Sequence, residues 1–295
     1  MKTLWQDIRY GLRMLGKSPG FTVIALVTLA IGIGANTIMF NVVDTLLFRP
    51  LQVKDPDRLV YCGARFSNDR SGAFGYEMYT SMRDDNAAFS DLIAFHPFCR
   101  GGTWVRGSDT GPLNIMYASA NYFSALGVDP IHGRTFLPEE ERHGAELVGV
   151  LSYRMWKELG GSPEIVGQIV HANTMPCRII GVAPKGFTGT TVTGPDIWMP
   201  LGAYGSLEER HRQQRHYPYL HLIGRLKPDL DMTAAEARLQ VLTPRLKEMN
   251  RFWKDDPQLQ LYLARLGRIE VEATNTLNDL KNRAMLGMVM MGVSS

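Results

Sequence analysis

A long uncharged run near the start dominates the hydrophobic pattern of the chain. The run FTVIALVTLAIGIGANTIMFNVV, from Phe21 to Val43, holds 23 residues without a charge. As a helix it would reach about 35 Å, enough to cross a hydrocarbon core of about 30 Å. A helix also gives every backbone amide an internal partner within lipid. The pattern therefore predicts a transmembrane helix over residues 20–48.

Two other interpretations of this run are weaker. A cleaved signal peptide has an apolar core of only about 7–15 residues. Gly32-Ile33-Gly34 could serve as its small-x-small cleavage site, but the apolar run continues well beyond it. A buried helix of a soluble protein would more often show a polar stripe. Gly32, Gly34 and Ala35 would let another helix approach closely, although glycine is also simply common in membrane helices.

The segment before this run carries the orientation signal. Its four cations Lys2, Arg9, Arg13 and Lys17 against the single anion Asp7 give a charge of +3. Positive flanks stay in the cytoplasm. Residues 1–19 are therefore expected to form a cytoplasmic amphipathic segment at the inner face of the bilayer. The main body would lie in the periplasm, beyond the bacterial inner (plasma) membrane.

Residues 11–18, GLRMLGKS, match the phosphate-binding pattern G-x-x-x-x-G-K-[ST]. Such a loop works because it joins a buried strand to a helix N-terminus that faces the phosphates. Here only ten residues precede Gly11, and their spacing is helical. Pro19 also biases Ser18 away from helical dihedrals. We interpret Lys17 as a topology signal and expect no nucleotide site.

After Pro50 the pattern changes to short strands and helices, which is typical of an α+β region. Strands are predicted over residues 58–62, 91–98, 113–119, 146–151, 168–172, 177–182, 219–226, 259–263 and 268–271, and helices over 76–84, 121–126, 153–159 and 233–250. HANTMP would join two of the strands as a hairpin. Ser152 should cap helix 153–159, and Thr233 with Glu236 should form a capping box on helix 233–250.

Composition narrows the functional classes. Hydrophobic residues make up 45% of the 295-residue chain and charged residues 21%, as in ordinary folded proteins. Since the net charge is +3 and the first 19 residues carry +3, residues 20–295 sum to zero. A nucleic-acid partner is not expected, because such proteins carry a basic surplus on the folded body. Cys62, Cys99 and Cys177 allow either one disulfide of unknown pairing or three buried thiols.

The sequence shows no pattern for catalytic, cofactor-binding or metal-binding residues. It has no H-E-x-x-H, and its one match to G-x-S-x-G, GKSPG at residues 16–20, lies at the start of the predicted transmembrane helix and not between a strand and a helix. His211, His216 and His221 lie five apart, which places them on no single helical face, so a basic loop is expected there. The run Glu139–Glu141 after Pro138 suits the first turn of a short helix. The Gly/Thr-rich stretch 188–195, TGTTVTGP, is interpreted as a surface hairpin, since no helix follows it.

Three segments of the body carry a family resemblance: YASANYFSALGVDPIHGRTFLPEEE, LVGVLSYRMWKELGGSPEIVGQIV and CRIIGVAPKGF. They resemble the periplasmic core domain of MacB-like ABC transporter permeases. The start of the chain, from WQDIRYGLRML to KSPGFT, is similar to the duplicated orphan-permease subgroup, whose ATPase is encoded separately. The resemblance covers nearly the whole chain.

The resemblance implies an organisation and a role. Residues 49–283 would form the MacB-like periplasmic core domain, with a porter-like part over 51–119 and 218–279 and an inserted Sabre-like lobe over 120–217. The protein would be a non-catalytic permease component of an ABC-type efflux or envelope transport system. Its partners would be the membrane lipid bilayer, a cytoplasmic ABC ATPase, a permease dimer partner and an envelope adaptor protein. The alternatives are a membrane-anchored binding module without transport and, less favoured, an envelope hydrolase.

The end of the chain departs from the family. The apolar run AMLGMVMMGV, residues 284–293, would cover about 15 Å as a helix, half of the hydrocarbon core. We interpret residues 284–295 as the start of an incomplete second transmembrane helix and expect the chain to be truncated relative to the family.

Overall fold

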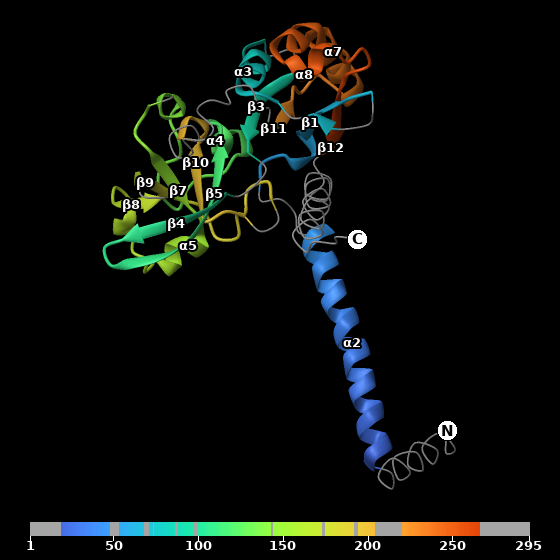
Figure 1. The fold of residues 1–295 in the computed structure, drawn as a ribbon, viewed down its shortest axis with the longest axis vertical. Coiled ribbons are helices and arrows are strands. Elements are labelled where there is room, and N and C mark those ends of the chain that lie inside the picture. The colour runs from blue at the N-terminus through green and yellow to red at the C-terminus, as the bar shows by residue number, and fades with distance from the viewer. Residues whose placement is uncertain are drawn as a thin grey trace, which may run out of the picture. The chain divides into compact units, whose positions relative to one another are not determined.

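The computed structural model describes residues 19–47, 53–67, 71–72, 74–85, 88–96, 100–142, 144–172, 175–191, 194–203 and 220–265. The chain divides into two compact units, Met1–Pro50 and Leu51–Ser295, which are described separately here. Figure 1 shows the elements of both units.

The described part of the first unit is one helix, α2, Pro19–Leu47. Apolar side chains along it are exposed, including Ile24 at 68% and Ile31 at 67%. Thr28 and Thr37 donate their hydroxyls to the carbonyls four residues earlier, so these polar groups are satisfied within the helix. A helix is thus present where the sequence predicts one. Among the residues that the structure describes, no helix combines the length and the apolarity of a membrane-spanning segment.

The second unit is built on one sheet, to which twelve strands of the described residues belong. The strands are β1 Leu59–Arg65, β2 Ser71–Gly72, β3 Phe89–Phe95, β4 Arg100–Arg106, β5 Asp109–Ala118, β6 His132–Gly133, β7 Val148–Leu151, β8 Ile169–Ala172, β9 Met175–Val182, β10 Ile197–Pro200, β11 His221–Leu226 and β12 Gln260–Arg265. The α-helices are α3 Tyr76–Asp85, α4 Tyr122–Leu126, α5 Tyr153–Glu158, α7 Met232–Met249 and α8 Arg251–Lys254, and the 3-10 turns are η1 Pro56–Arg58, η2 Pro138–Glu141 and η3 Pro163–Ile165.

Six of the strands close into a ring. β10 pairs in parallel with β5 and antiparallel with β7, which completes the circuit β5-β4-β8-β9-β7-β10. Residues such as Ile115, Ile179 and Ile197 alternate along these strands into one apolar core. We call these six strands with α5 the ring lobe, drawn mostly in green in Figure 1. A closed circuit leaves no unpaired strand edge.

The other four long strands form an antiparallel sheet in the order β3-β11-β1-β12. Residues from α3, α7 and α8, among them Met78, Leu239 and Trp253, pack with this sheet in the same buried cluster that contains the ring residues named above. We call this part the four-strand lobe (Figure 1). Side chains of α7 cap main-chain groups of β12: Glu236 Oε1 accepts from Leu263 N at 2.8 Å, and Gln240 donates to Leu261 O.

The helix caps partly follow the prediction. Ser152 Oγ accepts from Met155 N at 3.2 Å, so the predicted cap of α5 is confirmed. The Thr233 capping box is wrong. The helix begins at Met232, and Asp231 Oδ1 accepts from Ala234 N at 2.7 Å. With Asp231 as N-cap, the third helical position is Ala234, so Glu236 lies outside a capping box, and its carboxylate instead contacts β12.

Most predicted strands and helices of the body are present within a few residues, and β8 and β9 form the predicted hairpin. β4 and β10 were not predicted. The hairpin expected over residues 188–195 is wrong, because the described residues of this stretch form turns and a bend. Cys62 and Cys177 are buried and free. Residues 11–18, 268–271 and 284–295, Cys99, His211 and His216 lie outside the described residues.

The strand pairing also bears on the predicted division of the body. The boundary expected between residues 119 and 120 follows β5, yet β4 and β5 pair within the ring. By strand pairing alone, the ring lobe begins at β4, and the predicted boundary between residues 119 and 120 stays a prediction. The names porter-like and Sabre-like remain predictions for the two lobes.

Candidate functional site

The two lobes are joined by very little backbone. β3 of the four-strand lobe and β5 of the ring share one register pair, Phe95 with Ala118. Two backbone hydrogen bonds flank it, from His96 N to Tyr117 O and from Ser119 N to Ala94 O, both at 2.8 Å. A joint this narrow needs side chains to fix its geometry. We call the side chains that do so, Tyr76, Tyr79, Ser119, Asn121 and Glu141, the seam.

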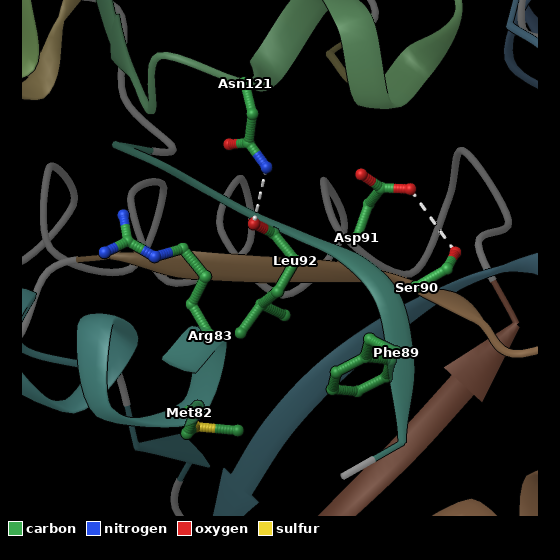
Figure 2. A pocket seen from close by; sticks show the side chains of 7 residues that line it. All are labelled: Met82, Arg83, Phe89, Ser90, Asp91, Leu92 and Asn121. Atoms are coloured by element: carbon green, nitrogen blue, oxygen red, sulfur yellow. Dashed lines mark hydrogen bonds between the residues drawn. The ribbon is translucent and has the colours of Figure 1, made fainter. Parts of the chain in front are cut away.

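The residues just after β5 reach back to β3. Ser119 is buried, and its Oγ accepts from Ala94 N at 3.1 Å while donating to Asn121 Oδ1 at 2.8 Å. Asn121 Nδ2 donates to Leu92 O at 3.0 Å, the contact drawn in Figure 2. The polar side chains that end β5 thus satisfy backbone groups of β3, because no further ladder is available there.

Glu141 is the one carboxylate among the five seam residues. It lies at the end of η2 and is only 7% exposed. Its Oε2 accepts from Ala120 N at 2.6 Å, and its Oε1 accepts from the Tyr76 hydroxyl at 3.1 Å. Within the described residues no Lys or Arg forms an ion pair with it. A buried carboxylate without a cation depends on its hydrogen bonds, so these two contacts carry its stabilisation.

The two tyrosines of α3 are held as hydrogen-bond donors. Burial, followed by the negative charge of Glu141, raises the pKa of the Tyr76 phenol well above its ordinary value. The same two causes raise the pKa of Tyr79 to about 12. Tyr79 is fully buried, and its hydroxyl donates to Asn121 Oδ1 at 3.5 Å. Both phenols therefore stay protonated at neutral pH.

A small cavity of about 210 Å³ opens beside the seam (Figure 2). Its lining comes from α3, β3 and the first residue before α4: Met82, Arg83, Phe89, Ser90, Asp91, Leu92 and Asn121. Arg83 in this lining is already engaged by Asp84 at 3.0 Å and by the Tyr79 ring at 5.4 Å. The volume lies below the range of about 300–1,000 Å³ typical of small-molecule sites. The cavity therefore gives no support for a small-molecule site.

An apolar core crosses the joint as well. Trp198 of β10 and Val150 of β7 share one buried cluster with Phe95 of β3 and Ile223 of β11. Phe123 of α4 lies at its centre and packs edge-on against Trp198 with ring centroids 5.5 Å apart. The seam is thus a narrow backbone joint above a continuous apolar contact between the lobes.

Ser152, His221 and the run Glu139–Glu141 have structural roles in the described part of the body. Ser152 caps α5, and His221 is the first residue of β11. Of the run Glu139–Glu141, Glu140 accepts from Leu137 N at the start of η2, as a first-turn carboxylate should, whereas Glu141 was missed as a seam residue. Among the described residues no group of three His, Cys, Asp or Glu side chains could hold a metal ion.

A double-mutant cycle measures the Tyr76–Glu141 contact. Tyr76→Phe and Glu141→Gln are each expected to lower the free energy of unfolding by about 1–2 kcal/mol, since each removes a hydrogen bond to a charged group. Because both act on one contact, the double variant should lose about 1 kcal/mol less than the sum. Urea unfolding of the full chain in detergent gives the values. Tyr153→Phe on α5 is the control partner and should be additive with Glu141→Gln. An equally additive Tyr76 pair would contradict the contact.

The chain is similar to known transport proteins in sequence. The family model of the MacB-like periplasmic core domain matches residues 22–242. The macrolide export ATP-binding/permease protein MacB of Burkholderia thailandensis is 26% identical over 242 residues, covering 80% of this chain and 34% of that protein. The probable syringafactin export ATP-binding/permease protein SyfD of Pseudomonas syringae pv. tomato is 25% identical over 240 residues, covering 78% and 33%. The chain therefore spans about a third of the length of these relatives.

Solved structures share the fold. A domain of a putative permease from Porphyromonas gingivalis superposes with a TM-score of 0.54 at 13% identity, covering 74% of this chain and 94% of that domain. The periplasmic region of MacB from Actinobacillus actinomycetemcomitans gives 0.51 at 13% identity, with coverage of 76% and 92%. The extracellular domain of the transporter YknZ from Gram-positive bacteria gives 0.51 at 15% identity, with coverage of 69% and 98%.

Proposed function

Because this chain belongs to the family of MacB-like periplasmic core domains, we propose that it is a non-catalytic permease component of an ABC-type export system. Its body couples the motion of a cytoplasmic ABC ATPase to substrate movement in the periplasm. The observation that carries this proposal is the seam, where the backbones of the two lobes pair at one register position and polar side chains complete the contact beside a shared apolar core. Lobes whose backbones pair at so few positions can shift relative to each other by sliding at a packed side-chain interface.

The membrane anchor is a proposal from the sequence. Residues Phe21–Val43 carry no charge, and all four cations of the first 19 residues precede them. The exposed apolar side chains of α2 support it, because such a surface requires an apolar surrounding. We propose that α2 holds the chain in the bacterial inner membrane with the N-terminus in the cytoplasm and the body in the periplasm.

Topology can be measured with a reporter fused after residue 60. Alkaline phosphatase at this point should be active, because it would be exported. Replacing Lys2, Arg9, Arg13 and Lys17 together by Gln should reduce that activity several-fold by removing the positive flank. The control Asp7→Asn keeps the positive excess and should leave activity unchanged. An inactive wild-type reporter would overturn the orientation, and release of the full chain from membranes by alkaline carbonate would overturn the anchor.

Coupling can be measured between the lobes. Spin labels at Ser108, the tip of the β4–β5 hairpin, and at Val241 on α7 report on one lobe each; both positions are exposed. With the cognate ABC ATPase in lipid, ATP should shift the label separation, and an ATPase variant that cannot hydrolyse ATP should abolish repeated shifts. Cys99 is replaced by Ala, while Cys62 and Cys177 are buried. An unchanged separation under turnover would contradict coupling and favour the anchored binding module.

The remaining partners belong to the same proposal. A second permease copy would complete the transport path across the bilayer, and an envelope adaptor protein would contact the periplasmic body. The relatives' names support this setting, since they describe export proteins with ATP-binding and permease parts. No cofactor or metal enters the proposal.

A further inference from the structure

The first residues of the body, 53–58, form what we call the entry segment, which follows α2 in the sequence. Lys54 N donates to Leu126 O at the end of α4 at 2.8 Å. Val53 packs against the apolar core that crosses the seam. Arg58 donates to Leu226 O at the end of β11. The entry segment is thus fixed to α4 and to the four-strand lobe at once.

One buried side chain adds further hydrogen bonds to the same segments. Arg225 of β11 is 9% exposed. Its Nη2 donates to Lys54 O at 2.7 Å and to Ala125 O at 2.8 Å, and its Nη1 donates to Asp55 O at 3.2 Å. The guanidinium of this β11 residue therefore contacts both the entry segment and α4. Its planar fork of five donors suits this arrangement, which the point charge of a lysine cannot reproduce.

This junction is costly to maintain. Within the described residues no carboxylate forms an ion pair with Arg225, so its charge is buried among neutral carbonyls. Asp55 beside it has a φ of 44°, and it is the one non-glycine residue of the described chain with a positive φ. A buried cation and a non-glycine residue with left-handed backbone angles persist only where several surrounding contacts hold them in place.

We infer that Arg225 is a positioning residue that makes the entry segment, β11 and α4 move as one body. A displacement that enters from α2 is then passed to the four-strand lobe through β11. The same displacement is passed through α4 to the apolar core that crosses the seam. The inference rests on the proposed function, because it names the residue through which the body receives its mechanical input. We call these three hydrogen bonds of Arg225 the clamp; without it, the entry segment keeps its contacts with Leu126 and Leu226 but loses the side chain that ties β11 to α4.

The clamp is tested by the separation of spin labels at Asp57 in the entry segment and Ser124 on α4, both exposed. The full chain in lipid should give a narrow distance distribution. Arg225→Met should broaden it at least twofold, and Arg225→Lys, which keeps the charge and the stem, should also broaden it. The control Arg178→Met removes an exposed cation of the ring, 43% exposed, and should leave the width unchanged. Equal widths in wild type and both Arg225 variants would overturn the inference.

The Ser108–Val241 pair separates this inference from the proposed function. If wild type shifts with ATP, Arg225→Lys should lose at least half of that shift while its resting separation stays the same. An undiminished shift in the variant would overturn the role of Arg225 and leave the permease proposal standing. A wild type that does not shift would instead overturn the coupling function, and the role of Arg225 with it, whatever the width of the Asp57–Ser124 distribution.

Discussion

Replacing Trp198 by alanine is expected to lower the free energy of unfolding by about 3–5 kcal/mol. Trp198 is fully buried in β10, and its ring packs against Phe123 and Phe187 with centroids 5.5 Å apart in each case. β10 is hydrogen-bonded to β5 on one side and to β7 on the other, so the backbone cannot collapse into the space left behind. The loss should affect both lobes, because this core crosses the seam.

Urea unfolding of the full chain in detergent, followed by far-ultraviolet circular dichroism, measures this effect. Trp198→Phe keeps much of the aromatic contact and should lose less than half as much. Val241→Ala removes a side chain that is 77% exposed and should change stability by no more than about 0.5 kcal/mol. A loss below about 1 kcal/mol for Trp198→Ala would show that the core is not shared as the structure has it.

The parts of the fold that the sequence predicts are those determined by nearby residues. Helix α5 has its cap, Ser152, directly before it, and the glycines 160 and 161 directly after it. The β8–β9 hairpin pairs Ala172 with Met175 across two residues. In each case the decisive contact spans a few positions, so the local pattern is sufficient.

The parts that were missed depend on distant partners. β10 is four residues long and exists through parallel pairing with β5, Ile197 opposite Ile115. β4 contains Gly101 and Gly102, which weaken any strand pattern, and it is completed by Trp104 pairing with Ala172. The ring therefore closes through contacts that no local window contains. The ring lobe is therefore defined by pairings that the local sequence pattern does not show.

The seam could not be predicted from the local sequence pattern, because its contacts also join residues that are distant in the sequence. Three successive glutamates after a proline indicate a helix start, and Glu140 does serve that role. Nothing in the run distinguishes Glu141, whose partners Ala120 and Tyr76 lie 21 and 65 positions away. The polar residues Ser119 and Asn121, placed directly after a buried strand, are the one local signal that could have indicated the joint.

The strand edges of the sheet are paired or covered by side chains, so they do not favour the addition of a strand from another chain. The ring has no edge, and Glu236 and Gln240 occupy main-chain groups of β12. Exposed edges would offer templates for pairing with other chains. Partners of the body are therefore expected to contact side-chain surfaces, which allows a contact to persist while the lobes move.

Acidification is expected to destabilise the protein through His221. This residue begins β11 with its ring between those of Tyr61 and Phe95, at centroid distances of 5.5 and 5.9 Å. Its Nδ1 is buried and has no hydrogen-bond partner among the described residues. Burial, followed by the nearby charge of His96, lowers the pKa of His221 from 6.5 to about 4. The folded state therefore favours the neutral ring.

The sign of the pH effect follows from proton binding. Between pH 6.5 and 4 the unfolded chain binds a proton at this site that the folded chain does not, so the free energy of unfolding falls as pH falls. The contribution is fully present above pH 6.5, and the total loss by pH 4 is about 3 kcal/mol, with about 2 kcal/mol lost by pH 5. Urea unfolding at pH 7.5, 6, 5 and 4 measures it. His221→Phe should flatten the dependence, whereas His171→Gln, at an exposed position of β8, should leave it parallel to wild type. A curve for His221→Phe as steep as that of wild type would assign the acid sensitivity to other groups, because the buried ring would then not be the site that gains the proton.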